Sequence, residues 1–157
     1  MFNNNYAIVL LQKNELLPLD LLLMADETEA AVRKYIFQSE VYLVTDKISH
    51  EKIAVFVLFK IDNTKLEIKN IAITEKLRGK GIGSWLISNI KQIATQQNYK
   101  SLIVGTPDCA IQQINFYQKA GFIPFALKEN FFINNYEEPI YENGILLKDM
   151  LMLKMTL

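Results

Sequence analysis

The 157-residue sequence is short of the residues on which several kinds of site depend. It contains one cysteine, Cys109, and one histidine, His50. A single cysteine cannot form an internal disulfide or a cysteine-rich metal site, and Cys109 is expected to be an inert small residue at a helix start. With one histidine, zinc sites built on histidines and serine–histidine catalysis have little support. His50 lies in a polar stretch and is expected to be an ordinary exposed loop residue.

Neither sign of charge is in excess, and long apolar runs are missing. Lysine plus arginine number 17, as do aspartate plus glutamate, so the sequence lacks the broad basic surface of a nucleic-acid-binding protein. Residues 1–6 have no basic region followed by an apolar run, and the leucine-rich stretch 16–24 is interrupted by Pro18 and Asp20. The sequence therefore predicts no signal peptide and no membrane span, and a cytoplasmic protein is the simplest inference.

Half of the residues are hydrophobic, which indicates one folded domain over residues 1–157 with a substantial core. No internal repeat, low-complexity tract or linker divides it. The apolar periodicity predicts strands at 6–11, 41–45, 53–61, 65–73, 101–106, 122–127 and 145–155, and helices at 16–24, 29–37, 82–98 and 110–120. Strand 53–61 reads as a central strand with 65–73 as its hairpin partner.

The most informative stretch is a glycine-rich turn, Arg78-Gly79-Lys80-Gly81-Ile82-Gly83, between an apolar strand and a helix. Such a turn presents backbone N–H groups at a helix start and suits an anion, of which a cofactor pyrophosphate is the expected one. Ser84 or Leu86 stands where a dinucleotide fingerprint needs its third glycine, which disfavours a flavin or nicotinamide enzyme. The spacing does not fit a phosphate loop of the nucleoside-triphosphatase type either. Taken alone, the stretch could also be an ordinary turn.

A second motif, Phe116-Tyr117-Gln118-Lys119-Ala120-Gly121-Phe122, follows at a definite separation. The order of strand, R-x-x-G-x-G, helix, strand, helix and F-Y-x-K-x-G-F resembles the GNAT superfamily of N-acetyltransferases, from about Val41 to the C-terminus. The resemblance implies an α/β (α+β) fold, with a mixed, mostly antiparallel twisted sheet that splays between its fourth and fifth strands and is flanked by helices. It also implies acetyl-CoA as co-substrate, wedged into that opening.

The resemblance assigns the cofactor-binding groups to two neighbouring segments. Backbone groups of Ile71, Ala72 and Ile73, at a bulge in the fourth strand, would bind the pantetheine arm and the thioester carbonyl. The pyrophosphate would be held by the amides of Arg78, Gly79, Lys80, Gly81, Ile82, Gly83 and Ser84. The glycines would keep side chains away from it.

Acetyl transfer requires the amine to lose a proton and the departing thiolate to gain one. Tyr117 matches the family tyrosine that can protonate the thiolate, and its alternative role is an aromatic anchor between neighbouring phenylalanines. Glu67, in its E-I-x-x-x-A-I setting, resembles the catalytic glutamate of the histone-acetylating branch. The alternatives are a solvated carboxylate paired with Lys65 or Lys69, and deprotonation through water with no single essential base.

The sequence departs from the family at Ala110, where many members have an asparagine that binds the pantetheine arm. Asp108, Asn115 or a water are the candidates to replace it. This departure motivates a rival hypothesis, a non-catalytic acyl-CoA-binding regulatory module of GNAT fold.

The acetyl acceptor is left open by the sequence. Residues 130–144, rich in aromatic and acidic residues, resemble the bacterial YvbK-like branch; they could attract an ammonium group and wall a pocket, or form a hairpin that caps the core. A small-molecule amine or a protein amine remains open as acceptor. Family members often form dimers, so a homodimer is also open. No metal, nucleic-acid or membrane partner is expected.

Overall fold

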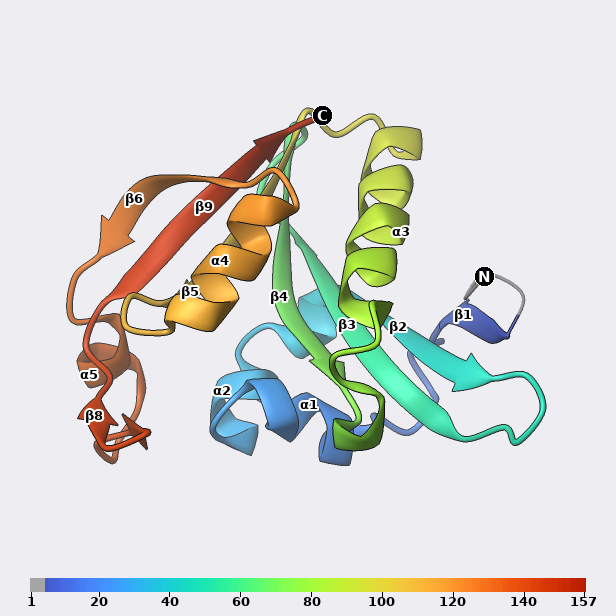
Figure 1. The fold of residues 1–157 in the computed structure, drawn as a ribbon, viewed down its shortest axis with the longest axis horizontal. Helices are drawn as coiled ribbons and strands as arrows, with labels where there is room; N and C mark the ends of the chain where they lie inside the picture. The colour runs from blue at the N-terminus through green and yellow to red at the C-terminus, as the bar shows by residue number, and fades with distance from the viewer. Residues whose placement is uncertain (1–4) are drawn as a thin grey trace.

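The computed structural model describes residues 5–157, so the prediction on a signal peptide falls mainly outside the described residues. A seven-stranded sheet has the order β1-β2-β3-β4-β5-β9-β6, and β7 and β8 form a small second sheet (Figure 1). The strands are β1 (Tyr6–Leu10), β2 (Ser39–Asp46), β3 (Lys52–Lys60), β4 (Lys65–Ile73), β5 (Ser101–Pro107), β6 (Ile123–Lys128), β7 (Tyr141–Glu142), β8 (Ile145–Leu146) and β9 (Met150–Thr156). The helices are α1 (Leu19–Ala25), α2 (Glu29–Arg33), α3 (Ile82–Gln96), α4 (Ile111–Lys119) and α5 (Phe131–Asn135), with 3-10 turns η2 (Ile36–Gln38) and η3 (Glu75–Leu77).

The sheet opens between β4 and β5, as the resemblance implies. These two strands pair in parallel only from Lys65 opposite Ser101 to Ile68 opposite Val104. Beyond that point β4 stays with β3 and β5 stays with β9, so the two halves of the sheet diverge in a V (Figure 1). The other pairings in the large sheet are antiparallel, including the predicted hairpin of β3 and β4. The predicted fold class is therefore confirmed.

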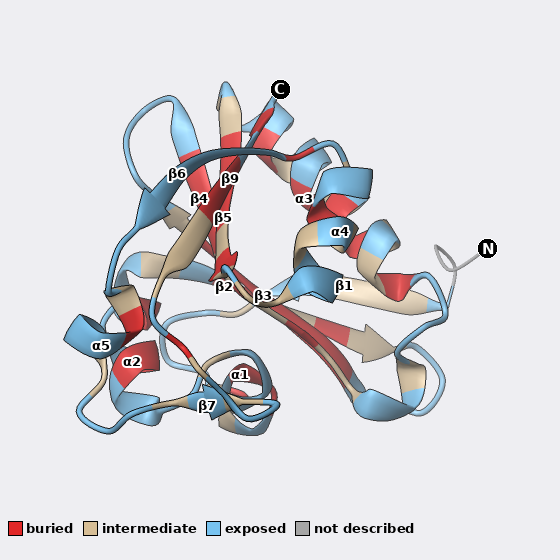
Figure 2. Ribbon diagram, turned by 60° about the vertical axis from the view of Figure 1, so that its left-hand side comes forward, coloured by how far each residue is buried: buried red, intermediate tan, exposed pale blue. Residues whose placement is uncertain are grey.

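Two hydrophobic clusters lie on opposite faces of the sheet because successive side chains of a strand alternate between faces. On β3, Phe56 and Leu58 belong to the cluster that packs against α3 and α4, whereas Val55 and Val57 belong to the cluster that packs against α1 and η2. Six consecutive residues of β3 are buried, which explains its near-continuous apolar sequence. Figure 2 shows the buried residues along the middle of the sheet and on the inner sides of α3 and α4.

The prediction of one final strand over residues 145–155 is wrong. Leu147 leaves the strand direction and its N–H donates to the Ile140 carbonyl at 2.8 Å, while the side chain is 1% exposed. The Asp149 carbonyl accepts the Asp108 N–H at 3.1 Å. These bonds divide the segment into β8, which pairs with β7, and β9, which enters the large sheet.

The second predicted helix is shorter than its apolar pattern suggests. Thr28 caps α2 by accepting the Ala31 N–H at 3.1 Å, and the helix ends at Arg33 instead of residue 37. The Ser39 hydroxyl donates to the Tyr35 carbonyl at 2.6 Å, which turns the chain through η2 into β2. The turn places Tyr35 against the core, where its side chain contributes to the site described below.

Candidate functional site

Among the described residues, no strand pairs beyond Ile68 with the edge of β4 that faces the opening of the sheet. A bulge begins at the same place: Asn70 faces Val57, whereas Ile68 faces the next residue of β3, Leu58, so Lys69 is the extra residue. A bulge bends a strand and re-aims its side chains. The bend therefore coincides with the point where β4 leaves β5.

The predicted cofactor residues Ile71, Ala72 and Ile73 lie on this open edge. Ala72 packs into the cluster against α1, while Ile71 and Ile73 pack on the α3 side. The Ile73 carbonyl accepts a hydrogen bond from Arg78 Nε at 3.1 Å, which ties the glycine turn to the end of β4. An open edge with its backbone donors and acceptors is a surface on which an amide-bearing chain can add as a strand.

The glycine turn begins α3 with its backbone in the left-handed region. Gly79 has a φ of +74° and Gly81, the N-cap of α3, has a φ of +86°. Such angles strain residues that carry a Cβ, so the backbone conformation of this turn requires glycine at both positions. No side chain of the described residues caps α3, and the N–H groups of Ile82, Gly83 and Ser84 have no partner within the helix. An uncapped helix start of this kind binds anions.

Positive charge accompanies the uncapped helix start. Arg78 and Lys80 are exposed, and within residues 5–157 neither forms an ion pair. Gly83 has an additional role in packing, because a Cβ added there would lie 3.2 Å from the Phe116 ring of α4. This glycine lets α3 and α4 approach each other, a reason that the motif alone does not reveal.

Tyr117 lies on α4 and is 7% exposed. Its ring makes edge contacts with Phe116, at a centroid distance of 5.3 Å, and with Phe122, at 5.6 Å. Burial raises the pKa of Tyr117 to about 12, so the phenol is protonated at neutral pH. Its hydroxyl makes no hydrogen bond to another of the described residues. The anchoring contacts are thus present, and the hydroxyl is kept in the form that an acid needs.

Glu67 is buried on β4, with 7% of its surface exposed. Its Oε1 lies 3.4 Å from Lys69 Nζ, and that ammonium lies 5.5 Å from the centroid of the Phe59 ring. Lys65 pairs instead with Asp62 at 3.1 Å. Of the alternatives for Glu67, the solvated carboxylate and the Lys65 pair are therefore wrong, and the Lys69 pair is correct. Its role as a base stays a prediction.

A polar network that sequence reasoning missed crosses from β4 to the C-terminal segment. Asn70, 3% exposed, donates through Nδ2 to the Leu22 carbonyl at 2.9 Å and to the Tyr35 hydroxyl at 3.2 Å. The Tyr35 hydroxyl donates to Asp26 Oδ2 at 3.1 Å, and the Tyr136 hydroxyl donates to Asp26 Oδ1 at 2.6 Å. Asn70 gave no distinct signal in the sequence, because β4 also contains Lys65, Glu67 and Lys69, and the other members of the network are far apart in sequence.

Ala110, the position at which the resemblance implies an asparagine in many family members, is the N-cap of α4 and offers no side-chain cap. Ala110 lines a hollow of about 340 Å³. One wall of the hollow is the start of α4, from Cys109 to Gln113, and the other wall is the β7–β8 turn, with Glu142 and Asn143. Asp108 is exposed just before this helix start, and its N–H donates a hydrogen bond to the Asp149 carbonyl. Asn115, the second candidate replacement, is exposed on α4.

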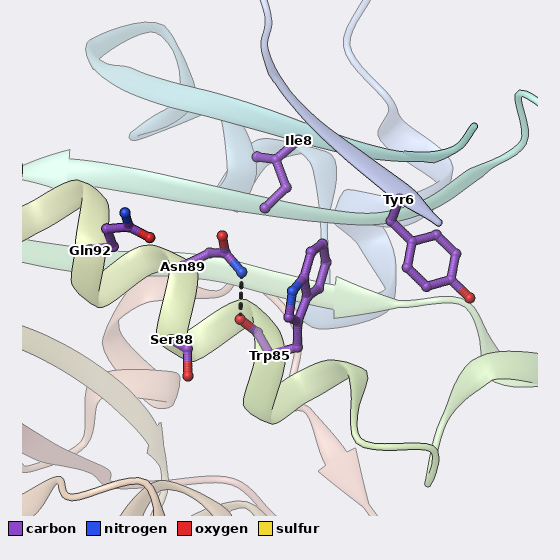
Figure 3. A pocket seen from close by; sticks show the side chains of 6 residues that line it. All are labelled: Tyr6, Ile8, Trp85, Ser88, Asn89 and Gln92. Atoms are coloured by element: carbon purple, nitrogen blue, oxygen red, sulfur yellow. Dashed lines mark hydrogen bonds between the residues drawn. The ribbon is translucent and has the colours of Figure 1, made fainter. Parts of the chain in front are cut away.

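A larger hollow, of about 520 Å³, lies elsewhere, between β1 and α3. Figure 3 shows the side chains that line it: Tyr6, Ile8, Trp85, Ser88, Asn89 and Gln92. None of them belongs to the open edge of β4, to the glycine turn or to α4, so this hollow is separate from the candidate cofactor site. His50 is exposed in the turn between β2 and β3, with a φ of +62°, as predicted.

Two classes of feature are absent from residues 5–157. No group of three or more potential metal ligands is present there, and no helix is long and apolar enough to cross a membrane.

Comparison with known proteins gives concordant matches. Residues 13–122 match the model of the acetyltransferase (GNAT) family. The chain is 37% identical over 138 residues to the uncharacterized N-acetyltransferase YvbK of Bacillus subtilis, with 88% of each chain covered. A GNAT family acetyltransferase from Elizabethkingia anophelis, solved with acetyl-CoA bound, superimposes with a TM-score of 0.91 at 39% identity, over 98% of this chain and 99% of that one. A Bacillus subtilis acetyltransferase in complex with CoA gives a TM-score of 0.86 at 34% identity, over 97% and 99%.

Proposed function

The chain belongs to the GNAT family of acetyltransferases, and we propose that it transfers the acetyl group of acetyl-CoA to a primary amine by direct attack on the thioester. Acetyl-CoA is its co-substrate. The observation that carries the proposal is the open edge of β4 leading, through the Arg78–Ile73 hydrogen bond, into the uncapped start of α3.

The donor site combines two kinds of backbone group in one continuous segment. Residues 71–73 offer the open strand edge to the pantetheine amides, and the N–H groups from Arg78 to Ser84 offer the helix start to the pyrophosphate. The exposed side chains of Arg78 and Lys80 add positive charge beside it. These residues fit the co-substrate because the strand edge and the helix start have no partner among residues 5–157.

Acetyl transfer replaces the carbon–sulfur bond of the thioester with a carbon–nitrogen bond, and it requires two proton transfers. The amine nitrogen forms a bond to the thioester carbon, the carbon–sulfur bond breaks, and the sulfur receives a proton from the Tyr117 hydroxyl. The proton lost by the amine passes to Glu67 or to a water relay. Glu67 lies on the α1 side of β4, since its partner Lys69 contacts Phe59 and Tyr35 of the cluster on that face.

The rival function, an acyl-CoA-binding module without turnover, is motivated by Ala110. Two measurements separate it from the enzyme. Acetyl-CoA at millimolar concentration is expected to raise the melting temperature by several degrees, because a ligand that binds only the folded state stabilises it. Thiol release from acetyl-CoA is then followed across a panel of small amines and lysine peptides. Absence of the melting shift contradicts a donor site, whereas a shift with no release for any amine favours the module.

A further inference from the structure

The bulge in β4 turns two consecutive side chains to the same face of the sheet. Successive side chains of a strand normally alternate between faces. On either side of the bulge, Ile68 and Ile71 pack against the α3 side. Between them, Lys69 contacts aromatic rings of the α1 side, and Asn70 donates a hydrogen bond to a carbonyl of α1. With Glu67, which contacts Lys69, three polar side chains therefore lie on the α1 side of β4 where the sheet opens.

The Lys69 ammonium is fixed by three contacts. Its Nζ lies 3.4 Å from Glu67 Oε1, 5.5 Å from the centroid of the Phe59 ring and 5.9 Å from that of the Tyr35 ring. The face of an aromatic ring attracts an ammonium group. The Tyr35 ring is itself held in place, because its hydroxyl donates to Asp26 Oδ2 at 3.1 Å. A lysine side chain is normally flexible, so these contacts give the ammonium a defined position.

The Glu67 carboxylate depends on this one ammonium. The Glu67 side chain is 9% exposed, and Lys69 is its only ion-pair or hydrogen-bond partner among residues 5–157. The contact is made through Oε1. Oε2 has no partner among these residues, yet it is not one of the enclosed polar atoms that lack a partner, which are Asn70 Oδ1 and Thr74 Oγ1. Oε2 therefore reaches the surface of the molecule, as the acceptor atom of a base must.

We propose that Lys69 is a positioning residue for acetyl transfer, whose ammonium holds Glu67 through Oε1 and leaves Oε2 to take the proton that the acceptor amine loses. The inference rests on the proposed function and selects Glu67 as the base. The amine proton forms a bond to Oε2, and the neutral acid returns that proton to solvent once the product has left. Removing the only countercharge of a largely buried carboxylate is unfavourable, so without Lys69 the Glu67 carboxylate is expected to turn toward water.

The test is a double-mutant cycle on Lys69 and Glu67. Lys69→Met keeps a flexible side chain against the two rings and removes the charge. Initial rates of thiol release are measured over a range of acetyl-CoA concentrations with the best acceptor among the small amines and lysine peptides. Lys69→Met is expected to lower kcat about tenfold and Glu67→Gln about 10²-fold, with little change in the KM for acetyl-CoA. In the Glu67→Gln background, Lys69→Met is expected to have no further effect, because the ammonium acts only through the carboxylate.

Further variants separate the charge of Lys69 from its packing. Lys69→Arg keeps a cation that can lie on the two rings, so it is expected to retain at least about half of kcat. Lys69→Gln is neutral, is expected to match Lys69→Met, and replaces it in the cycle if Lys69→Met does not fold. Lys65→Met is the matched control, since it removes a lysine of the same strand whose partner is Asp62, at 3.1 Å. It is expected to leave kcat unchanged, and melting temperatures show whether each variant is folded.

The outcomes distinguish the inference from the proposed function. An equal loss of kcat from Lys69→Met in both backgrounds, or no loss in either, would overturn the positioning role. A loss in Lys69→Arg as large as in Lys69→Met would also contradict it. An undiminished kcat in Glu67→Gln would remove the base, and with it the role of Lys69, while the acetyltransferase function stands. No thiol release with any amine from the unmodified protein would reject the proposed function itself and the inference that depends on it.

Discussion

At the scale of single residues, Tyr117 combines packing and chemistry in one side chain. Its ring is fixed by two phenylalanines, and its hydroxyl is free of hydrogen bonds to the described residues. Because burial raises its pKa to about 12, the tyrosine keeps its proton throughout the range in which an enzyme of this kind works. The two roles that the motif leaves open are therefore compatible.

Tyr117→Phe separates them. The phenylalanine ring keeps the contacts with its neighbours, so the free energy of unfolding is expected to change by less than about 1 kcal/mol, whereas the loss of the acid lowers kcat by about 10²-fold. The affinity for acetyl-CoA stays near that of the unmodified protein. Steady-state thiol release and an acetyl-CoA titration measure both quantities. Tyr99→Phe, in the loop before β5, controls for loss of a hydroxyl; an undiminished kcat in Tyr117→Phe would remove the acid role.

Glu67 and Gly83 show how far a motif predicts the surroundings of a residue. The sequence indicated a strand position for Glu67 and offered Lys65 or Lys69 as its partner, but its burial and the choice of Lys69 came from the structure. Gly83 belongs to the predicted anion-binding turn, yet the contact with Phe116 depends on where α4 packs. For Gly83 the missing information is a contact with an element distant in sequence, and for Glu67 it is the register between β4 and its hairpin partner β3.

At the scale of elements, the glycine turn joins a strand edge to a helix start. Its two left-handed residues aim the chain so that the first N–H groups of α3 are presented beside the end of β4. The glycine spacing predicted a turn with exposed N–H groups at a helix start, and the left-handed backbone of Gly79 and Gly81 is a finding of the structure. A bulge in this strand was implied by family resemblance at Ile71 to Ile73. The structure places it slightly earlier, at Lys69, where the register with β3 shifts.

Gly79→Ala tests the turn against a matched control. Gly79 and Gly144 have φ values of +74° and +77°, and a Cβ added at either would meet no atom within 4 Å. Both alanine variants are therefore expected to lose about 1 kcal/mol of stability from backbone strain alone. Only Gly79→Ala is expected to lower the affinity for acetyl-CoA, by at least tenfold, because it displaces an N–H group proposed to bind the pyrophosphate. Denaturant unfolding and acetyl-CoA titration provide the comparison; equal affinity in the two variants would place the pyrophosphate elsewhere.

At the scale of the whole molecule, the C-terminal segment links the two halves of the sheet. It leaves β6, contacts α1 and α2 through Tyr136 and Asn135, and returns through β9 to pair with β5. Phe132 and Leu147 bury their side chains on the way. Residues far apart in the sequence, in α1, α2 and the segment after α5, are thus held together on the α1 side of the sheet.

Tyr136→Phe measures how much one bond contributes to this link. Loss of a hydrogen bond to a carboxylate is expected to cost about 1.5 kcal/mol, which speeds amide exchange in residues 131–147 roughly tenfold. Amides of β3 and β4 should exchange as before, since their ladders do not involve this segment. Hydrogen exchange followed by mass spectrometry resolves the two regions. Tyr141→Phe, in which the exposed tyrosine of β7 loses its hydroxyl, is the control, and an equal change in both variants would contradict the link.

The sequence by itself determined the features that depend on neighbouring residues. Strand and helix periods and the two GNAT motifs are local patterns. The periods predicted the order of the elements, and the resemblance carried by the motifs implied the splayed sheet and the co-substrate. Only the tertiary structure decided the Glu67–Lys69 pair, the division of residues 145–155 into two strands and the network through Asn70, Asp26 and Tyr136. These depend on contacts between residues up to 110 positions apart, whose partners are chosen by packing and by hydrogen bonds that no local pattern specifies.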